Sequence, residues 1–229
     1  LTVSGATNTV AGTTGTFTAT ETTGNLAVGA ADILTKSGTV NLTASGAGKS
    51  ISSLSGSNIQ TNVTGVGAAV NLTADNMSLA GSTTTGTGVV TLTSSTAGQI
   101  INVGATATDS GTVLGLSDLE LNTIISTGGV TVGTAANTGG IVIVGSANPT
   151  GVTGSVGAFS LTTGGAITRT GGTLGTSSTA IDLSLNAVTG IGALPASPIV
   201  IGTVTGSLSA INGGAGGSGD LFLSTGAIT

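Results

Sequence analysis

Short segments in which apolar and polar residues alternate recur along the whole chain. The clearest are VNLTA at 40–44 and 70–74 and VTLT at 90–93. In each of them the first and third residues are apolar, which is the pattern of a strand with one buried face. Looser copies occupy residues 119–123, 141–145, 159–163, 181–185 and 221–225. Because helical periodicity is poor throughout, the pattern predicts an all-β protein.

The copies recur at a spacing typical of stacked repeats. Counted from the first apolar residue of each copy, from Phe17 to Leu221, the steps are 23, 30, 20, 29, 22, 18, 22, 20 and 20 residues. A single turn cannot bury its own apolar face, whereas stacked turns can. The spacing therefore predicts a parallel β-helix of about ten rungs with roughly 20 residues each, two of them lengthened by looped-out insertions.

The apolar positions of the copies form the predicted core. Directly stacked rungs place each apolar pair over the pair of the preceding rung. The alternative fold is an antiparallel β-sandwich, but hairpin signals are scarce and Asn212-Gly213 is the only Asn-Gly pair. The predicted core ladder comprises Val40, Leu42, Val70, Leu72, Val90, Leu92, Leu119, Leu121, Ile141, Ile143, Phe159, Leu161, Ile181, Leu183, Leu221 and Leu223.

Composition narrows the functional classes. Charged residues make up 5% of the chain, against about 25% in a typical domain. Lys36, Lys49 and Arg169 are the only basic residues, too few to neutralise the phosphates of a nucleic acid. Without His or Cys, sites built on imidazole or thiolate cannot form. No eighteen apolar residues run together. The composition predicts no nucleic-acid partner, no metal, no cofactor and no transmembrane segment.

Three phrases carry a family resemblance. SGTVNLTASGAGKSI (37–51), TGVVTLTSSTAGQII (87–101) and FSLTTGGAITRTGG (159–172) resemble repeats of filamentous-haemagglutinin-like proteins, which are large secreted bacterial adhesins. The resemblance implies a right-handed parallel β-helix that lies outside the cell or at its surface. No secretion-domain motif of that family is recognisable in this sequence, so the resemblance defines neither an export route nor a binding partner.

Two glycine-containing motifs fall short of nucleotide sites. Lys49 lies in the stretch GAGKS, but Thr43 stands where a phosphate-binding loop GxxxxGK[ST] has its first glycine. Lys49 is therefore interpreted as part of a corner between strands. Residues 214–219, GAGGSG, satisfy GxGxxG but lead into a strand-like DLFL, whereas dinucleotide binding needs a helix there. The same segment is one residue short of a calcium-binding GGxGxD repeat, and no second copy completes a site.

One carboxylate pair and four asparagines remain as candidates. Asp118 and Glu120 flank Leu119, and strand alternation would place both on one face about 7 Å apart. Such a pair could serve glycoside hydrolysis or hold a cation, but a solvated strand face is the favoured interpretation. The sequons at Asn41, Asn62, Asn71 and Asn76 arise easily by chance in a Thr-rich chain. Asn41 and Asn71 are predicted to stack as outward polar positions.

Three functions remain open. The first is a structural segment of an extracellular fibre, in which residues 1–229 form one solenoid that continues beyond one or both ends or stacks end to end with copies of itself. The second is a binding module for surface carbohydrate, through loops at 51–69 and 100–118, or for ice. The third and weakest is a carbohydrate-active enzyme. Ice binding is disfavoured by a mixed outward column of Asn41, Asn71, Thr91, Glu120, Val142, Ser160, Asp182 and Phe222.

Overall fold

The computed structural model describes residues 1–3, 8–10, 15–30, 32–63, 66–152, 158–175, 182–192, 197–202, 206–213 and 220–225. Within these ranges the chain forms 23 short strands and a single four-residue helix, α1 (Asp118–Leu121). Every ladder between these strands is parallel. The prediction of an all-β fold with parallel strands is confirmed.

The strands form five sheets. Sheet 1 contains β3 (Phe17–Glu21), β6 (Val40–Ala44), β9 (Val70–Thr73), β12 (Val90–Thr93), β16 (Val130–Val132), β18 (Ala158–Thr163), β20 (Asp182–Ala187) and β22 (Leu208–Asn212). Sheet 2 contains β1 (Thr2–Val3), β4 (Leu26–Val28), β7 (Ser50–Ser53) and β10 (Asn76–Leu79). Sheet 3 contains β2 (Asn8–Val10), β5 (Ile33–Thr35), β8 (Asn58–Gln60), β11 (Ser82–Gly86) and β15 (Ile124–Ser126).

The two remaining sheets lie on the C-terminal side. Sheet 4 contains β14 (Val113–Leu116), β13 (Ile100–Val103), β17 (Ile141–Ile143) and β19 (Ile167–Arg169), in that spatial order. Sheet 5 contains β21 (Ile199–Ile201) and β23 (Leu223–Thr225).

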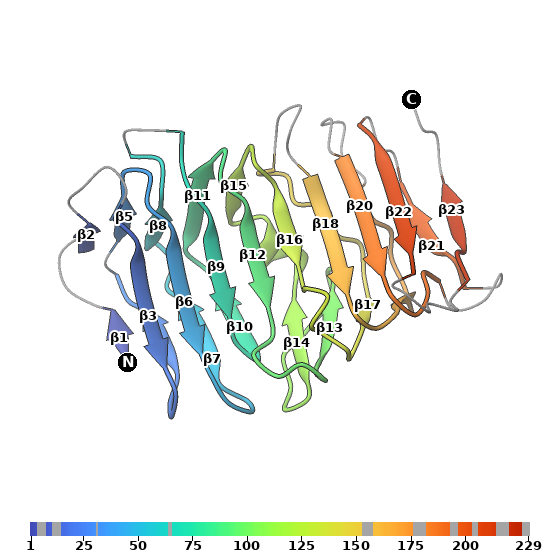
Figure 1. Ribbon diagram of the computed structural model, residues 1–229, viewed down its shortest axis with the longest axis horizontal. Coiled ribbons are helices and arrows are strands. Elements are labelled where there is room, and N and C mark those ends of the chain that lie inside the picture. The colour runs from blue at the N-terminus through green and yellow to red at the C-terminus, as the bar shows by residue number, and fades with distance from the viewer. Residues whose placement is uncertain are drawn as a thin grey trace.

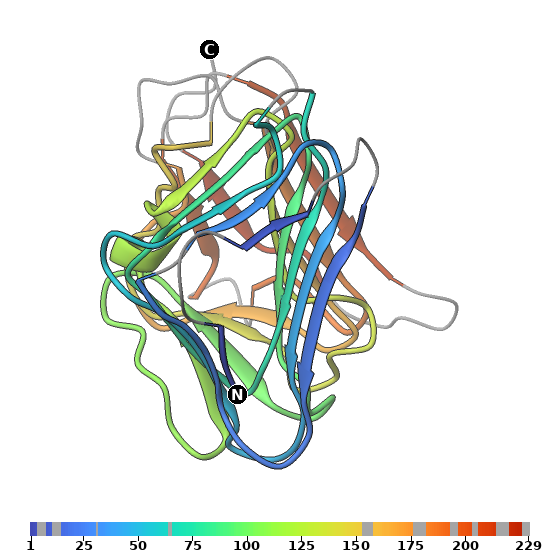
Figure 2. The ribbon, with the colours of Figure 1, turned by 90° about the vertical axis from the view of Figure 1, so that its left-hand side faces the viewer.

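The chain visits the sheets in a repeating order. From β3 to β11 it passes from sheet 1 to sheet 2 to sheet 3 and returns to sheet 1 each time. Sheet 1 faces the viewer in Figure 1, and the N-terminal and C-terminal strands lie at opposite ends of the stack. Figure 2 looks along the stack and shows sheets enclosing the interior on three sides. The topology is compatible with a β-solenoid.

Apolar residues of successive strands pair directly in sheet 1. Val40, Val70 and Val90 follow one another in register, and so do Leu42, Leu72 and Leu92. All six of these side chains are fully buried. The complete column through the first apolar position is Phe17, Val40, Val70, Val90, Val130, Phe159, Leu183 and Leu208.

The predicted core position at Leu119 is wrong. Val90 pairs with Val130, so residue 119 does not open a strand of sheet 1. Leu119 lies on α1 and is 82% exposed, whereas Leu121, on the same helix, is fully buried. The cause is local, because Ser117 and Glu120 form a capping box that starts a helix where the alternation predicted a strand.

Other predicted core residues lie outside sheet 1. Ile141 and Ile143 are buried, but they belong to sheet 4 and pair with Ile101 and Val103. Phe159 and Leu161, by contrast, do lie in sheet 1 and are buried there.

The last two copies, at 181–185 and 221–225, depart further from the predicted core ladder. Leu183 is buried and takes the place in the column that was predicted for Ile181, which lies outside the described residues. The expected core position at Leu221 is wrong, because this residue is 48% exposed. Leu223 lies in sheet 5 and is partly buried against the core.

Candidate functional site

An extra strand interrupts the stack between β10 and β13. Both β13 and β14 lie in sheet 4, and β14 lies on the side of β13 that faces β10. Sheets 1 and 3 gain no strand at this level, because β9 pairs directly with β12 and β11 pairs directly with β15. Between these two turns, the side formed by sheets 2 and 4 therefore holds three strands, β10, β14 and β13, where sheets 1 and 3 hold two each. We call the resulting opening between β10 and β14 the wedge.

Side-chain carboxylates replace backbone partners along the wedge. The Met77 N–H of β10 donates to Asp109 Oδ2 over 3.0 Å, and the Gly115 N–H of β14 donates to Asp109 Oδ1 over 2.8 Å. The Leu79 N–H of β10 donates to Glu120 Oε1 over 3.2 Å. These amides would otherwise be unpaired at a strand edge, which is costly. Asp109 therefore joins sheet 2 to sheet 4 without a strand-to-strand ladder.

This position changes the proton affinity of Asp109. Burial of the carboxyl is the largest influence and raises the pKa of Asp109 to about 6, although part of the residue stays exposed. The hydrogen bonds from Gly115 and Met77 act in the opposite direction, and the negative charge of Glu120 raises this pKa further. The elevated pKa is a consequence of the inserted strand, because the insertion places Asp109 between two backbone edges.

The Asp118 and Glu120 pair is not a strand pair. Both lie on α1, where Glu120 Oε2 accepts from the Ser117 N–H and hydroxyl while Oε1 accepts from Leu79. Asp118 Oδ1 accepts from the Asn148 N–H over 2.7 Å and Oδ2 accepts from Asn122 Nδ2 over 3.1 Å. Both carboxylates thus accept hydrogen bonds from neighbouring backbone and side-chain groups. The prediction that they share one face of a strand is wrong, because both lie on α1.

Asp75 joins the corners of three levels at the N-terminal end of β10. Its Oδ2 accepts from the Gly48 N–H and the Thr96 hydroxyl, and its Oδ1 accepts from the Thr96 N–H and the Ser95 hydroxyl. Burial of Asp75, which is 2% exposed, raises its pKa, but these hydrogen bonds together lower the pKa below its usual value. The carboxylate therefore stays ionised inside the stack.

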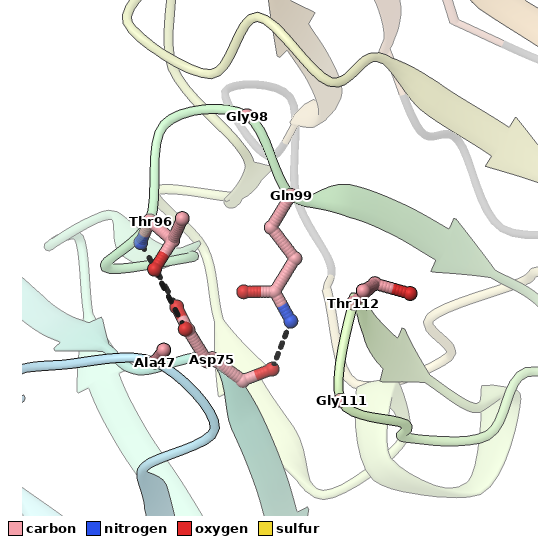
Figure 3. Close-up of a pocket in the computed structure, with 7 residues that line it drawn as sticks. All are labelled: Ala47, Asp75, Thr96, Gly98, Gln99, Gly111 and Thr112. Carbon is pink, nitrogen blue, oxygen red and sulfur yellow. Dashed lines mark hydrogen bonds between the residues drawn. The ribbon is translucent and has the colours of Figure 1, made fainter.

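The wedge opens into a hollow at each end. The hollow beside Asp75 has a volume of about 280 Å³ and is also lined by Thr96, Gln99 and Thr112 (Figure 3). The hollow at the other end of β10 measures about 340 Å³, and Leu119 and Glu120 are among its lining residues. The hollows lie at the two ends of the same opening. In sheets 1 and 3 the neighbouring strands pair directly, whereas the extra strand β14 separates β10 from β13.

The two glycine motifs have different outcomes. Lys49 follows a tight turn in which Gly46 and Gly48 have positive φ, and β7 begins directly after it at Ser50. This local structure is a corner, with no helix to present a phosphate site. The GAGGSG segment at 214–219 lies outside the described residues.

The asparagines of the sequons make ladder contacts. Asn71 Nδ2 donates to Asn41 Oδ1 over 2.8 Å on the outer face of sheet 1. Asn62 Oδ1 accepts from Gln60 Nε2, and Asn76 Nδ2 donates to the Gly48 carbonyl. All four asparagines thus contribute side-chain hydrogen bonds between or along the strands and corners.

Sequence reasoning missed Asp109, Asp75 and Gln99. Ser117-x-x-Glu120 carries a readable capping-box signal, but nothing near Asp109 in the sequence indicates that it faces β10. Across the ranges that the structure describes, no three acidic, His or Cys side chains gather in a way that would hold a metal ion. In the same ranges no helix has the length and hydrophobicity needed to cross a bilayer.

Comparisons with models of protein families, with curated proteins and with solved structures each found no match.

Proposed function

We propose that this chain is a structural segment of an extracellular fibre, built as a right-handed β-solenoid that propagates by stacking of its turns. The observation that carries the proposal is the continuous in-register column of sheet 1, which runs through eight strands. A coil of this kind can be lengthened turn by turn in one dimension, since each turn contacts only its neighbours. The extracellular location and the adhesin type rest on the resemblance of the repeats.

The strand directions support a right-handed coil. In Figure 1 the strands of sheet 1 run downward on the near side while the chain advances from left to right, and the strands behind them run upward. Parallel crossovers in sheets are right-handed in the great majority of proteins. Among the described residues, sheet 1 holds eight strands, and the turn after Val90 is lengthened by β14 and α1. The proposed role is non-enzymatic, with further turns or copies of the chain as partners.

Electron microscopy of the purified chain tests this role. The Leu183 N–H donates to the Ser207 carbonyl and the Gly213 N–H donates to the Ala187 carbonyl. The alternation of a parallel ladder then leaves the Ala210 N–H on the open edge of β22. We expect end-to-end filaments for the natural sequence and short particles for Ala210→Pro, since proline removes that donor. A natural sequence that stays a monodisperse monomer at every concentration would contradict the proposal.

A second candidate function, ice binding, is favoured by the register of sheet 1. The sequence predicted a mixed outward column, whereas the outward column of sheet 1 in the structure consists of short uncharged polar residues. A second such column contains Thr20, Thr43, Thr73 and Thr93. Two parallel columns of short polar side chains at the strand spacing suit an ordered water lattice, and they offer no aromatic ring for sugar stacking. The first column is Thr18, Asn41, Asn71, Thr91, Thr131, Ser160, Ser184 and Ser209.

Thermal hysteresis distinguishes this candidate. We expect Thr91→Tyr to abolish hysteresis, because one bulky ring lifts the array off a flat lattice. Thr84→Tyr carries the same substitution on sheet 3 and should leave the effect intact. Ice crystals that grow unshaped in the natural protein would remove ice binding and leave the structural role standing.

A further inference from the structure

The outer face of sheet 1 carries two columns of side chains that point away from the core. Each column crosses the sheet from β3 toward β22, because the strands pair in register. The first column runs from Thr18 to Ser209, and the second continues toward the C-terminal end with Thr162, Asn186 and Ile211. All of these residues are partly or fully exposed, and Figure 1 looks onto the face that they form.

Neither column contains a charged residue. Asp182 lies at the border of the face, two residues before Ser184, and its Oδ1 accepts from the Ser207 N–H over 2.6 Å. Three of the eight acidic residues lie along the wedge instead, on the side formed by sheets 2 and 4: Asp75, Asp109 and Glu120. Like charges that face each other across an interface are strongly unfavourable. Two copies that meet through sheet 1 keep these carboxylates on sides that do not face each other.

Hydrogen bonds within the sheet lower the cost of covering this face. Asn71 Nδ2 donates to Asn41 Oδ1 over 2.8 Å, so these amides are partly paired before any second surface arrives. The hydroxyls of the columns both donate and accept, so they can bond along the sheet or across an interface. Short side chains also let two sheets approach to about 10 Å and interdigitate, as they do in steric zippers.

The face is large enough for a stable pair of copies. Eight strands at about 4.8 Å each span about 38 Å, and about five residues of a strand span about 16 Å. The face therefore covers about 600 Å² on each copy, which makes about 1,200 Å² for a pair. Stable protein interfaces begin at about this size, and their centres are depleted in charged residues.

We propose that the outer face of sheet 1 binds the same face of a second copy and so joins neighbouring fibres laterally in pairs. The pairing of fibres rests on the proposed function, whereas the contact between two copies needs no filament. The contact is isologous, so each copy contributes the same two columns, and the short side chains of one copy fill the spaces between those of the other. Thr91 and Thr131 lie on the two central strands, β12 and β16, and therefore in the middle of the contact.

Sedimentation equilibrium of the Ala210→Pro chain tests the pairing. This variant blocks the open edge of β22, so lateral association is measured apart from end-to-end stacking. We expect a dimer that Thr91→Lys, added to this chain, weakens by about a hundredfold or more, because the isologous contact would then bury two lysines close together. Thr84→Lys is the matched control, since it places the same charge on the outer side of β11 in sheet 3 and should leave the dimer intact. Thr131→Lys repeats the test on β16, and circular dichroism checks that each variant is folded.

The outcomes separate this pairing from the fibre role and from ice binding. The pairing is overturned if the folded Ala210→Pro chain stays monomeric at every concentration, or if Thr84→Lys weakens the dimer as much as Thr91→Lys does. Thermal hysteresis that Thr91→Lys abolishes without changing sedimentation would assign the face to ice and overturn the pairing. Dimers of Ala210→Pro without filaments of the natural chain would support the pairing and count against the fibre role. Filaments that stay single would support the fibre role and overturn the pairing.

Discussion

Truncation of Leu72 to alanine should lower the free energy of unfolding by about 2–5 kcal/mol. Leu72 is fully buried and stands in register between Leu42 and Leu92 in the centre of sheet 1. Removing its side chain opens a cavity. The neighbouring strands cannot move in to fill this cavity, because backbone ladders hold them in place on both sides. Urea unfolding followed by circular dichroism measures the loss.

The matched control is Leu119→Ala. Leu119 was predicted from the sequence to occupy the same core ladder, but it lies on α1 and is 82% exposed. We expect its truncation to change the free energy of unfolding by no more than about 0.5 kcal/mol. Equal losses for Leu72→Ala and Leu119→Ala would mean that the register of sheet 1 is wrong.

These two leucines also mark how far the sequence predicts the fold. Alternation correctly identifies the strand at Val70, because its apolar pair faces the interior and repeats at Val40 and Val90. Alternation does not tell which sheet a strand joins. Ile141 and Ile143 have the same pattern as Val70 and Leu72, yet they lie in sheet 4. Sheet membership depends on the path of the whole turn, which no single segment encodes.

The wedge depends on long-range register in the same way. Met77 and Asp109 lie 32 positions apart and meet because β14 lies back toward β10. The backbone accounts for part of this path, since a Cβ on Gly115 would lie 2.2 Å from the Thr108 carbonyl carbon. The loop before β14 therefore crosses over Gly115, and only glycine fits there. The need for glycine at position 115 can be recognised only when the positions of β14 and of the loop that crosses it are both known.

Glycines at the corner before sheet 1 are a second set of residues whose role depends on stacking. Gly38, Gly88 and Gly128 each stand two residues before the first apolar residue of a strand. A Cβ on Gly38 would lie 1.6 Å from the Gly15 carbonyl oxygen, and a Cβ on Gly128 would lie 2.1 Å from the Thr87 carbonyl oxygen. The turns are thus in backbone contact at this corner, with no room for a side chain.

Gly88→Ala should therefore destabilise the protein by about 3 kcal/mol, the upper part of the usual range for overpacking. The added Cβ would lie 2.0 Å from the Ala68 carbonyl oxygen, and backbone held in ladders on both sides cannot move away. Gly98→Ala is the control, since its Cβ would meet nothing within 4 Å and its φ is not positive. It should stabilise the chain by about 0.4–1 kcal/mol through the unfolded state. Chemical unfolding of both variants measures the difference, and a Gly88→Ala protein as stable as Gly98→Ala would contradict the close stacking of turns at this corner.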